Sequence, residues 1–95
     1  MIHYVYILKS LKDTRTYIGY TQNVTKRLLE HNSGKVDATK KRKPLVLLYQ
    51  ESCPNIKEVK YREQFWKNGS GRRKLKEYFL KGFPPIDANG RGSPS

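Results

Sequence analysis

The amino-acid sequence predicts an α+β fold in which helices flank a small three-stranded sheet, antiparallel or mixed, with the element order ββαβαα. Three observations support this prediction. The chain has 95 residues, which gives room for one domain with one modest core. Two short runs of β-branched and aromatic residues near the N-terminus are separated by a polar turn. Capping residues mark the starts of later helical segments.

The strands are predicted from runs of apolar side chains. In residues 3–9, β-branched, aromatic and aliphatic side chains occupy both alternating positions. Such a strand is covered on both faces, so it should lie in the centre of the sheet. The polar residues 12–15 form a turn, and residues 16–20 return as a second, antiparallel strand. Residues 45–50 form the third strand.

The first predicted helix runs from about residue 24 to residue 33. The Asn23 side chain can accept a hydrogen bond from an early backbone N–H, and Gly34 can adopt the left-handed conformation that ends a helix. Residues 35–43 then carry five cations and one anion before Pro44. We expect this basic loop to be exposed and mobile.

Two more helices are predicted in the second half of the chain. Asn55 and Glu58 have the spacing of a capping box, which opens a helix that reaches about residue 67. Asn68 with Gly69 ends this helix, and a last helix spans about residues 71–81.

The C-terminal segment differs in composition from the rest of the chain. From residue 82 onward, eight of 14 residues are Gly, Pro or Ser. Such a segment buries too little apolar surface to offset the loss of chain entropy. The sequence therefore predicts one folded domain over residues 1–81 and a disordered tail over residues 82–95.

The charge balance indicates a polyanionic partner. The 20 Lys and Arg residues against 8 Asp and Glu residues give a net charge of +12, which favours nucleic acid. We expect no membrane partner, because the cations are interleaved with core-type residues and no apolar run approaches ~18 residues. The N-terminus lacks a secretion signal and Cys53 is a single thiol, so we expect a cytoplasmic protein in which Cys53 packs as a small apolar residue.

One carboxylate falls on an apolar helix stripe. Ile56, Val59, Glu63 and Trp66 are spaced by 3, 4 and 3 residues, which places all four on one side of a helix. Glu63 therefore faces inward, where a charged carboxylate must be paired, protonated or bound to a metal. The structural alternative is a buried salt bridge with a cation of the first helix or of the tail.

A second group of polar residues lies along the first helix. Val24 and Leu28 define its apolar side, and Arg27 and His31, four residues apart, lie next to each other at the edge of that side. An arginine can bind a phosphate with two hydrogen bonds, and a histidine can exchange a proton near neutral pH. The structural alternative is a solvated arginine and a histidine that caps the helix.

The hairpin supplies phenols. Strand alternation places Tyr4 and Tyr6 on one face of the first strand, and Tyr17 on the same face of the second strand as Gly19. The missing side chain of Gly19 should leave space beside Tyr17, where a phenol can contact a phosphate or a water. Aromatic packing within the hairpin is the alternative.

Four sequence elements follow one another on the predicted strands and helices: Tyr4-Val5-Tyr6, Tyr17-Ile18-Gly19, Arg27 with His31, and Glu63. In this order, they resemble the GIY-YIG nuclease family over about residues 3–80. The chain is most similar to the small stand-alone bacterial members of the family, which consist almost entirely of the catalytic domain.

The resemblance implies an endonuclease that hydrolyses the phosphodiester backbone of DNA. Tyr6 and Tyr17 would be the motif tyrosines, and either Tyr17 or His31 would lie close to the attacking water. Arg27 would stabilise the scissile phosphate. Glu63 would hold a single divalent ion, Mg²⁺ or Mn²⁺, and Mg²⁺ often binds proteins through only one or two carboxylates.

The sequence departs from the family pattern at two positions. Tyr4 replaces the leading Gly of the first motif, which a strand tolerates because no positive φ is needed there. Tyr20 follows the second motif where some members place a lysine, so a supporting cation would come from elsewhere. Some members also use an asparagine after the catalytic glutamate, but Asn68 is better explained as a helix stop.

Two basic clusters are predicted to contact the DNA backbone. They consist of Lys40, Lys41, Arg42 and Lys43, and of Lys67, Arg72, Arg73 and Lys74. The substrate can be single-stranded, branched or duplex DNA, because no base-reading element is recognisable. A protein partner can supply substrate targeting to a domain this small. Two alternatives remain: a nucleic-acid-binding module without catalysis, and a structural protein whose charge only aids solubility.

Overall fold

A computed structural model describes residues 1–85. Its elements are β1 (His3–Ser10), β2 (Thr16–Thr21), α1 (Val24–Asn32), β3 (Leu45–Cys53), α2 (Ile56–Lys67) and α3 (Gly69–Lys81). The predicted order ββαβαα and the α+β class are confirmed. Residues 86–95, which make up most of the predicted tail, lie outside the described part of the chain.

The three strands form one sheet in the order β2-β1-β3. Both pairings are antiparallel, so of the two predicted arrangements the antiparallel one is correct. The central position of β1 is confirmed. β3 continues to Cys53, three residues beyond its predicted end, because Ser52 and Cys53 still pair with the start of β1.

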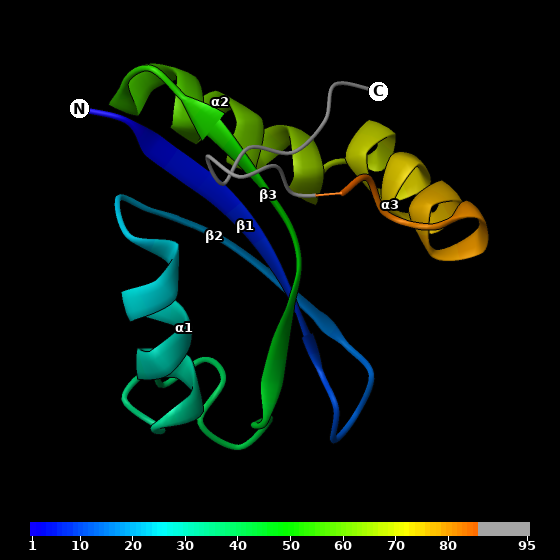
Figure 1. The fold of residues 1–95 in the computed structure, drawn as a ribbon. Helices are drawn as coiled ribbons and strands as arrows, with labels where there is room; N and C mark the ends of the chain where they lie inside the picture. Colours follow the sequence, from blue (N-terminus) through cyan, green and yellow to red (C-terminus); the bar gives the residue numbers. More distant parts are fainter. Residues whose placement is uncertain (86–95) are drawn as a thin grey trace.

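The two faces of the sheet carry different helices (Figure 1). On one face, Tyr6 and Leu8 of β1 pack with residues of α1 and of the start of β3. On the other face, Val5 and Ile7 pack with Trp66 of α2 and with residues of α3. Because successive side chains of β1 point to opposite faces, they contribute to two separate hydrophobic clusters. β1 is therefore buried on both sides, as its composition predicts.

Local polar contacts fix the helix ends. The side chain of Asn23 accepts from the backbone N–H of Lys26 at 3.0 Å, and Asn55 accepts from that of Glu58 at 2.9 Å. Gly34 has a φ of 82°, in the left-handed region where a residue without a side chain meets no steric penalty. All three predicted helix signals are confirmed.

The basic loop between α1 and β3 was predicted to be exposed, but parts of it are buried. Thr39 is fully buried and Val36 is nearly so. The loop is also tied to the hairpin, because the hydroxyl of Ser10 donates to the carbonyl of Arg42 and the Arg42 guanidinium pairs with Asp13 at 3.2 Å. The composition of this segment is typical of a mobile loop. Contacts with the hairpin, which no local sequence pattern indicates, nevertheless hold it in place.

Gly71 lets α3 pack tightly on the end of α2. A Cβ atom at this position would overlap the carbonyl oxygen of Phe65 and the Cα of Trp66. Both are backbone atoms, which cannot move aside as a flexible side chain can. The close approach of the two helices thus requires glycine at residue 71.

We expect Gly71→Ala to lower the free energy of unfolding by about 2 kcal/mol or more, since overpacking of a tight contact forces backbone shifts. Gly69→Ala is the matched control, because a Cβ there meets no atom within 4 Å. Urea denaturation of both variants measures the difference. Equal stability of the two variants would contradict the packing role of Gly71.

Candidate active site

The candidate site centres on a buried tyrosine and a buried histidine. The hydroxyl of Tyr6, on β1, lies 3.0 Å from Nε2 of His31, on α1. His31 is fully buried and Tyr6 nearly so. The sequence placed His31 at the edge of the core, whereas the structure encloses it between the sheet and the loop that follows α1. Its second ring nitrogen, Nδ1, lies 2.6 Å from the hydroxyl of Thr39.

Gly19 provides the space that Tyr6 occupies. The two residues are register partners in the β1–β2 pair, and a Cβ on Gly19 would lie 2.6 Å from the Tyr6 hydroxyl oxygen. The sequence predicts this gap, but as open space beside Tyr17. Instead, the Tyr6 ring fills this space. The glycine of the second motif therefore makes room for the tyrosine of the first.

Tyr17 packs against the same pair and remains partly exposed. Its ring centroid is 4.9 Å from that of His31, in an edge-on arrangement, and 6.3 Å from that of Tyr6. Both motif tyrosines therefore contact the histidine, and Tyr17 also lines a surface groove. Among the three rings, Tyr17 is the one that a ligand in this groove can reach.

Arg27 lies beside the Tyr6 hydroxyl. Burial raises the pKa of Tyr6, and hydrogen bonding from Arg27 opposes part of this rise. The same contact with Tyr6 raises the pKa of the Arg27 guanidinium, whose Nη1 also pairs with Glu30 at 3.3 Å. The Arg27 side chain keeps 37% exposure, so the guanidinium remains accessible from solvent. Burial, and then the charge of Arg27, lower the pKa of His31.

Glu63 approaches this cluster from α2. Its side chain is only 15% exposed, as its place beside Val59 and Trp66 predicts, although Ile56, expected on the same stripe, is 44% exposed at the start of the helix. The negative charge of Glu63 contributes to the raised pKa of Tyr6, which places the carboxylate within electrostatic range of the phenol. In residues 1–85 its ion-pair partner is Lys67, at 3.5 Å, and not a cation of α1. The tail cation of the structural alternative lies outside the described residues.

A second carboxylate, which the sequence motifs do not indicate, accepts hydrogen bonds from several side chains. Glu51 accepts two hydrogen bonds from Arg62, at 2.9 and 3.1 Å, one from the Trp66 indole at 2.8 Å and one from the Tyr49 hydroxyl at 3.3 Å. These contacts tie β3 to α2. The spacing of Arg62 and Trp66, one helical turn apart, is the signal that would have indicated a shared acidic partner.

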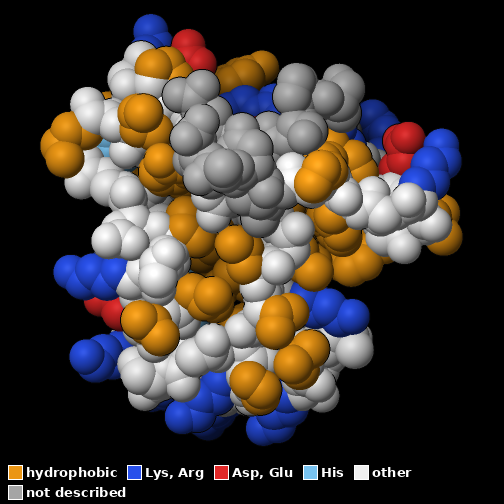
Figure 2. All heavy atoms as spheres, viewed as in Figure 1, with side chains coloured by type: hydrophobic (Ala, Val, Ile, Leu, Met, Phe, Trp, Pro, Cys, Tyr) orange, Lys and Arg blue, Asp and Glu red, His pale blue; other side chains and the backbone are white. Residues whose placement is uncertain are grey.

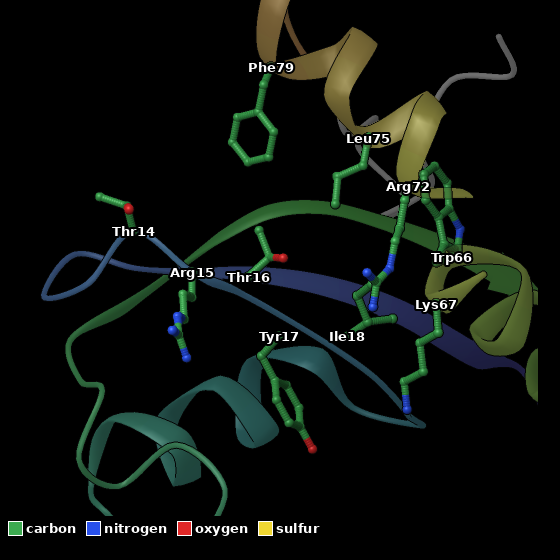
Figure 3. A pocket seen from close by; sticks show the side chains of 10 residues that line it. All are labelled: Thr14, Arg15, Thr16, Tyr17, Ile18, Trp66, Lys67, Arg72, Leu75 and Phe79. Carbon is green, nitrogen blue, oxygen red and sulfur yellow. The ribbon is translucent and has the colours of Figure 1, made fainter. Parts of the chain in front are cut away.

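Two grooves reach the cluster. The larger one, of about 880 Å³, lies between the hairpin and α3, with Arg15, Lys67 and Arg72 among its lining residues. Figure 3 shows the Tyr17 phenol and the Lys67 side chain extending past β2 toward the side of α1. A smaller groove, of about 350 Å³, is lined by Arg27 and other polar residues of α1. The cluster is therefore accessible from two directions, and both are rich in cations.

The predicted nucleic-acid-binding residues fall into three places. Lys67 and Arg72 line the larger groove, whereas Arg73 and Lys74 line a separate hollow on α3. The third place is the basic loop, where Lys40, Lys41 and Lys43 are exposed and Arg42 is held against Asp13. Figure 2 shows Lys and Arg side chains gathered along the lower edge of the molecule, over α1 and this loop.

The arrangement matches a known class of catalytic domain. The family model described as "GIY-YIG catalytic domain" matches residues 2–77. The chain therefore belongs to the GIY-YIG family, whose members are nucleases, and the resemblance inferred from the motifs is confirmed.

Within this family, the chain is similar to proteins named UPF0213. A UPF0213 protein of Staphylococcus haemolyticus is 48% identical over 75 residues, which cover 78% of this chain and 90% of that protein. One from Syntrophus aciditrophicus is 44% identical, over 77% of this chain and 85% of its own length. The solution NMR structure of the UPF0213 protein from Bacillus halodurans has a TM-score of 0.51 at 40% identity, and the match covers 86% of this chain and 87% of that one.

The described residues contain no helix that is both long enough and apolar enough to span a membrane. Residues 1–85 also hold no group of three or more His, Cys, Asp or Glu side chains arranged to bind a metal ion. Any metal at the candidate site would therefore depend on fewer protein ligands than a closed structural site uses.

The two carboxylates should differ in their effect on stability. We expect Glu51→Gln to lower the free energy of unfolding by about 2 kcal/mol or more, because a partly buried Arg62 loses its charged partner. Glu63→Gln should cost about 0.5 kcal/mol or less, the usual value of an ion pair one helical turn apart whose lysine lies largely in solvent. Urea denaturation compares the two isosteric variants. A large cost for Glu63→Gln would identify that carboxylate as structural.

The lowered pKa of His31 predicts loss of stability in mild acid. The unfolded chain takes up this proton near the ordinary pKa of about 6.5, whereas the folded protein resists it. The stabilisation is thus present above that pH and is lost as the pH falls toward the lowered pKa. NMR titration of the two histidine rings, assigned with His3→Gln, and unfolding measured from pH 8 to pH 5 test this. A His31 midpoint above 6.5 would refute it.

Proposed function

We propose that the protein is a metal-dependent endonuclease that hydrolyses phosphodiester bonds in DNA, with a site composed of Tyr6, Tyr17, Arg27, His31 and Glu63. One observation carries the proposal. A carboxylate that is only 15% exposed lies within electrostatic range of a buried phenol, in a protein with a net charge of +12. A carboxylate withdrawn from solvent needs compensating charge, which a bound divalent cation supplies.

The donor set suits a hard divalent cation. Glu63 offers carboxylate oxygens, and its ion-pair partner within residues 1–85 is Lys67, a flexible side chain that is 46% exposed and can move away. Mg²⁺ and Mn²⁺ prefer oxygen ligands, and Mg²⁺ retains several waters, so one carboxylate together with substrate oxygens is sufficient. When bound, such an ion supplies charge neutralisation at the phosphate and at the leaving oxygen.

Arg27 is the residue proposed to bind the scissile phosphate. The Arg27 side chain lines the smaller groove and is 37% exposed, so it can reach a ligand while it stays beside Tyr6. A planar guanidinium donates two parallel hydrogen bonds to phosphate oxygens. Because these bonds strengthen as negative charge develops, Arg27 would stabilise the transition state more than the bound substrate.

The tyrosines and His31 are proposed to handle the proton of the attacking water. The sequence left Tyr17 and His31 as alternatives for the group nearest this water. His31 is fully buried, and each ring nitrogen already has a hydroxyl partner, which favours Tyr17 as the group in contact with water. His31 would not contact the water itself. It would accept a proton from the phenols through its hydrogen bond with Tyr6.

The grooves offer a path for the DNA on both sides of the cluster. Arg15, Lys67 and Arg72 line one side, and Lys26 and Arg27 line the other. Contacts with the backbone phosphates through these cations carry no base preference and weaken steeply as salt rises. The exposed lysines of the basic loop would extend this non-specific contact.

A second candidate function is a nucleic-acid-binding module without catalysis. The ion pair between Glu63 and Lys67 favours it, because a lysine that permanently neutralises the carboxylate would occupy the position proposed for the metal. The two functions share the fold and the charge. They differ only in whether Glu63 can exchange its lysine for a divalent ion.

Glu63→Gln should abolish metal-dependent cleavage while DNA binding persists, since the amide is isosteric but cannot provide the anionic ligand. Cleavage of single-stranded, duplex and branched DNA, assayed with Mg²⁺, with Mn²⁺ and with chelator, measures the effect. Glu77→Gln is a matched control, because Glu77 forms the same pair with a lysine one turn later, Lys81 at 3.4 Å, on the exposed side of α3. This control should cleave as the wild type does.

The outcomes separate the two candidate functions. Wild-type protein that binds every substrate and cuts none in either metal would identify the binding module. Cleavage that persists in Glu63→Gln would remove Glu63 from the site. Loss of binding in Glu63→Gln, together with unfolding, would assign the carboxylate a structural role instead.

A further inference from the structure

Thr39 is a buried residue that no sequence motif indicates. It lies in the basic loop, eight residues after His31, with a fully buried side chain. Its hydroxyl oxygen is 2.6 Å from Nδ1 of His31, on the side of the ring opposite Tyr6. A polar side chain buried in this way is retained where its hydrogen bond matters, because an unpaired hydroxyl is costly in the core.

A neutral histidine has two tautomers, and the partners of its two nitrogens select between them. One nitrogen carries the proton and donates, while the other accepts. Both partners of His31 are hydroxyl groups, which can donate or accept, so these two contacts alone leave the tautomer open. The neighbours of the Tyr6 hydroxyl decide it.

Arg27 breaks this symmetry. A guanidinium has donors only, and the positive charge of Arg27 lies near the Tyr6 hydroxyl, so the lone pairs of the phenol oxygen are drawn to that side. The phenol proton is then directed to Nε2 of His31, at 3.0 Å. With Nε2 as acceptor, Nδ1 carries the ring proton and donates it to Thr39. The donors therefore run from Tyr6 through His31 to Thr39.

The backbone holds Thr39 in place from both sides. Its N–H donates to the carbonyl of Val36 at 3.1 Å, and its carbonyl accepts from the N–H of Arg42 at 2.8 Å. Arg42 is itself paired with Asp13 in the hairpin turn. The acceptor for Nδ1 is thus fixed to the sheet and does not move with the exposed lysines of the basic loop.

We propose that Thr39 is a positioning residue, which holds His31 in the Nδ1–H tautomer so that Nε2 is free to take the proton of Tyr6. In that transfer the O–H bond of Tyr6 breaks and an N–H bond forms at Nε2, leaving a phenolate beside Arg27 and an imidazolium. Thr39 accepts from Nδ1–H before and after the transfer, so the ring does not have to rotate. The consequence for catalysis rests on the proposed nuclease function, whereas the tautomer does not.

NMR of ¹⁵N-histidine-labelled protein tests the tautomer directly. The chain has two histidines, and His3→Gln assigns the signals. In the wild type at neutral pH, long-range ¹H–¹⁵N correlations should show a protonated Nδ1 and an unprotonated Nε2 on His31. Thr39→Val, which keeps the shape but loses the acceptor, should shift His31 toward the Nε2–H form. Thr39→Ser, which restores the hydroxyl, should restore the wild-type pattern.

Cleavage assays provide the second readout. Thr39→Val should lower the cleavage rate roughly 10- to 100-fold, as is typical when a group that orients a functional imidazole is removed, with unchanged DNA affinity. Thr39→Ser should recover most of the rate. If Thr39→Val unfolds, Thr39→Ala and Thr39→Ser are compared instead, and thermal unfolding identifies the folded variants.

The two readouts fail separately. An Nε2–H tautomer in the wild type, or an unchanged tautomer in a folded Thr39→Val or Thr39→Ala variant, would overturn the role of Thr39. An expected tautomer in a wild-type protein that cleaves no DNA supports that role and counts against the proposed nuclease function. A folded Thr39→Val variant that cleaves at the wild-type rate would show that positioning by Thr39 is irrelevant to catalysis.

Discussion

The hydroxyl of Tyr6 lies in the middle of the sheet face that α1 covers, where an unpaired polar group would be costly. Its hydrogen bond to His31 provides the partner that the hydroxyl needs. Several other parts of the molecule are arranged so that this hydrogen bond can form. Gly19 has to lack a side chain so that the ring fits, and α1 has to present His31 at that depth. The basic loop in turn has to fold back so that Thr39 can satisfy the second ring nitrogen. One buried phenol thus constrains the hairpin, the first helix and the loop.

The two buried carboxylates illustrate how structural and functional acids differ. Glu51 accepts hydrogen bonds from three side chains and joins β3 to α2, so its charge is fully used within the protein. Among residues 1–85, Glu63 has one long ion pair, with an exposed lysine of its own helix. A carboxylate that is withdrawn from solvent yet weakly paired retains the capacity to bind something else. This contrast, and not burial alone, distinguishes Glu63 as the candidate ligand.

The distribution of positive charge follows from the same architecture. The cations of the grooves lie on the β1–β2 turn, α1, α2 and α3, so they surround the cluster at different angles instead of forming one flat patch. Clefts lined by charge of one sign concentrate the electrostatic potential and attract a polyanion. The exposed lysines of the basic loop add to this field from the side of Thr39. Binding and positioning groups therefore share one segment of the chain.

Local signals in the sequence were sufficient for the elements of the fold. The alternating and helical periodicities, the caps at Asn23 and Asn55 and the stop at Gly34 act over a few residues, and the structure confirms them. The ordered motif also identified the family before any geometry was available. Glu63 was expected to be withdrawn from solvent because helical spacing alone places it beside Val59 and Trp66.

Contacts between residues distant in the sequence were decided only by the tertiary structure. These include the antiparallel pairing of β3, the filling of the gap at Gly19 by Tyr6, the network around Glu51 and the burial of Thr39 within a loop of basic composition. No periodicity encodes them, because each depends on how the twist of the sheet and the packing of the helices bring separate segments within hydrogen-bonding distance. The sequence by itself thus determined which side chains are available and on which elements they lie. Packing of the sheet against α1 and α2 decided which of these side chains meet.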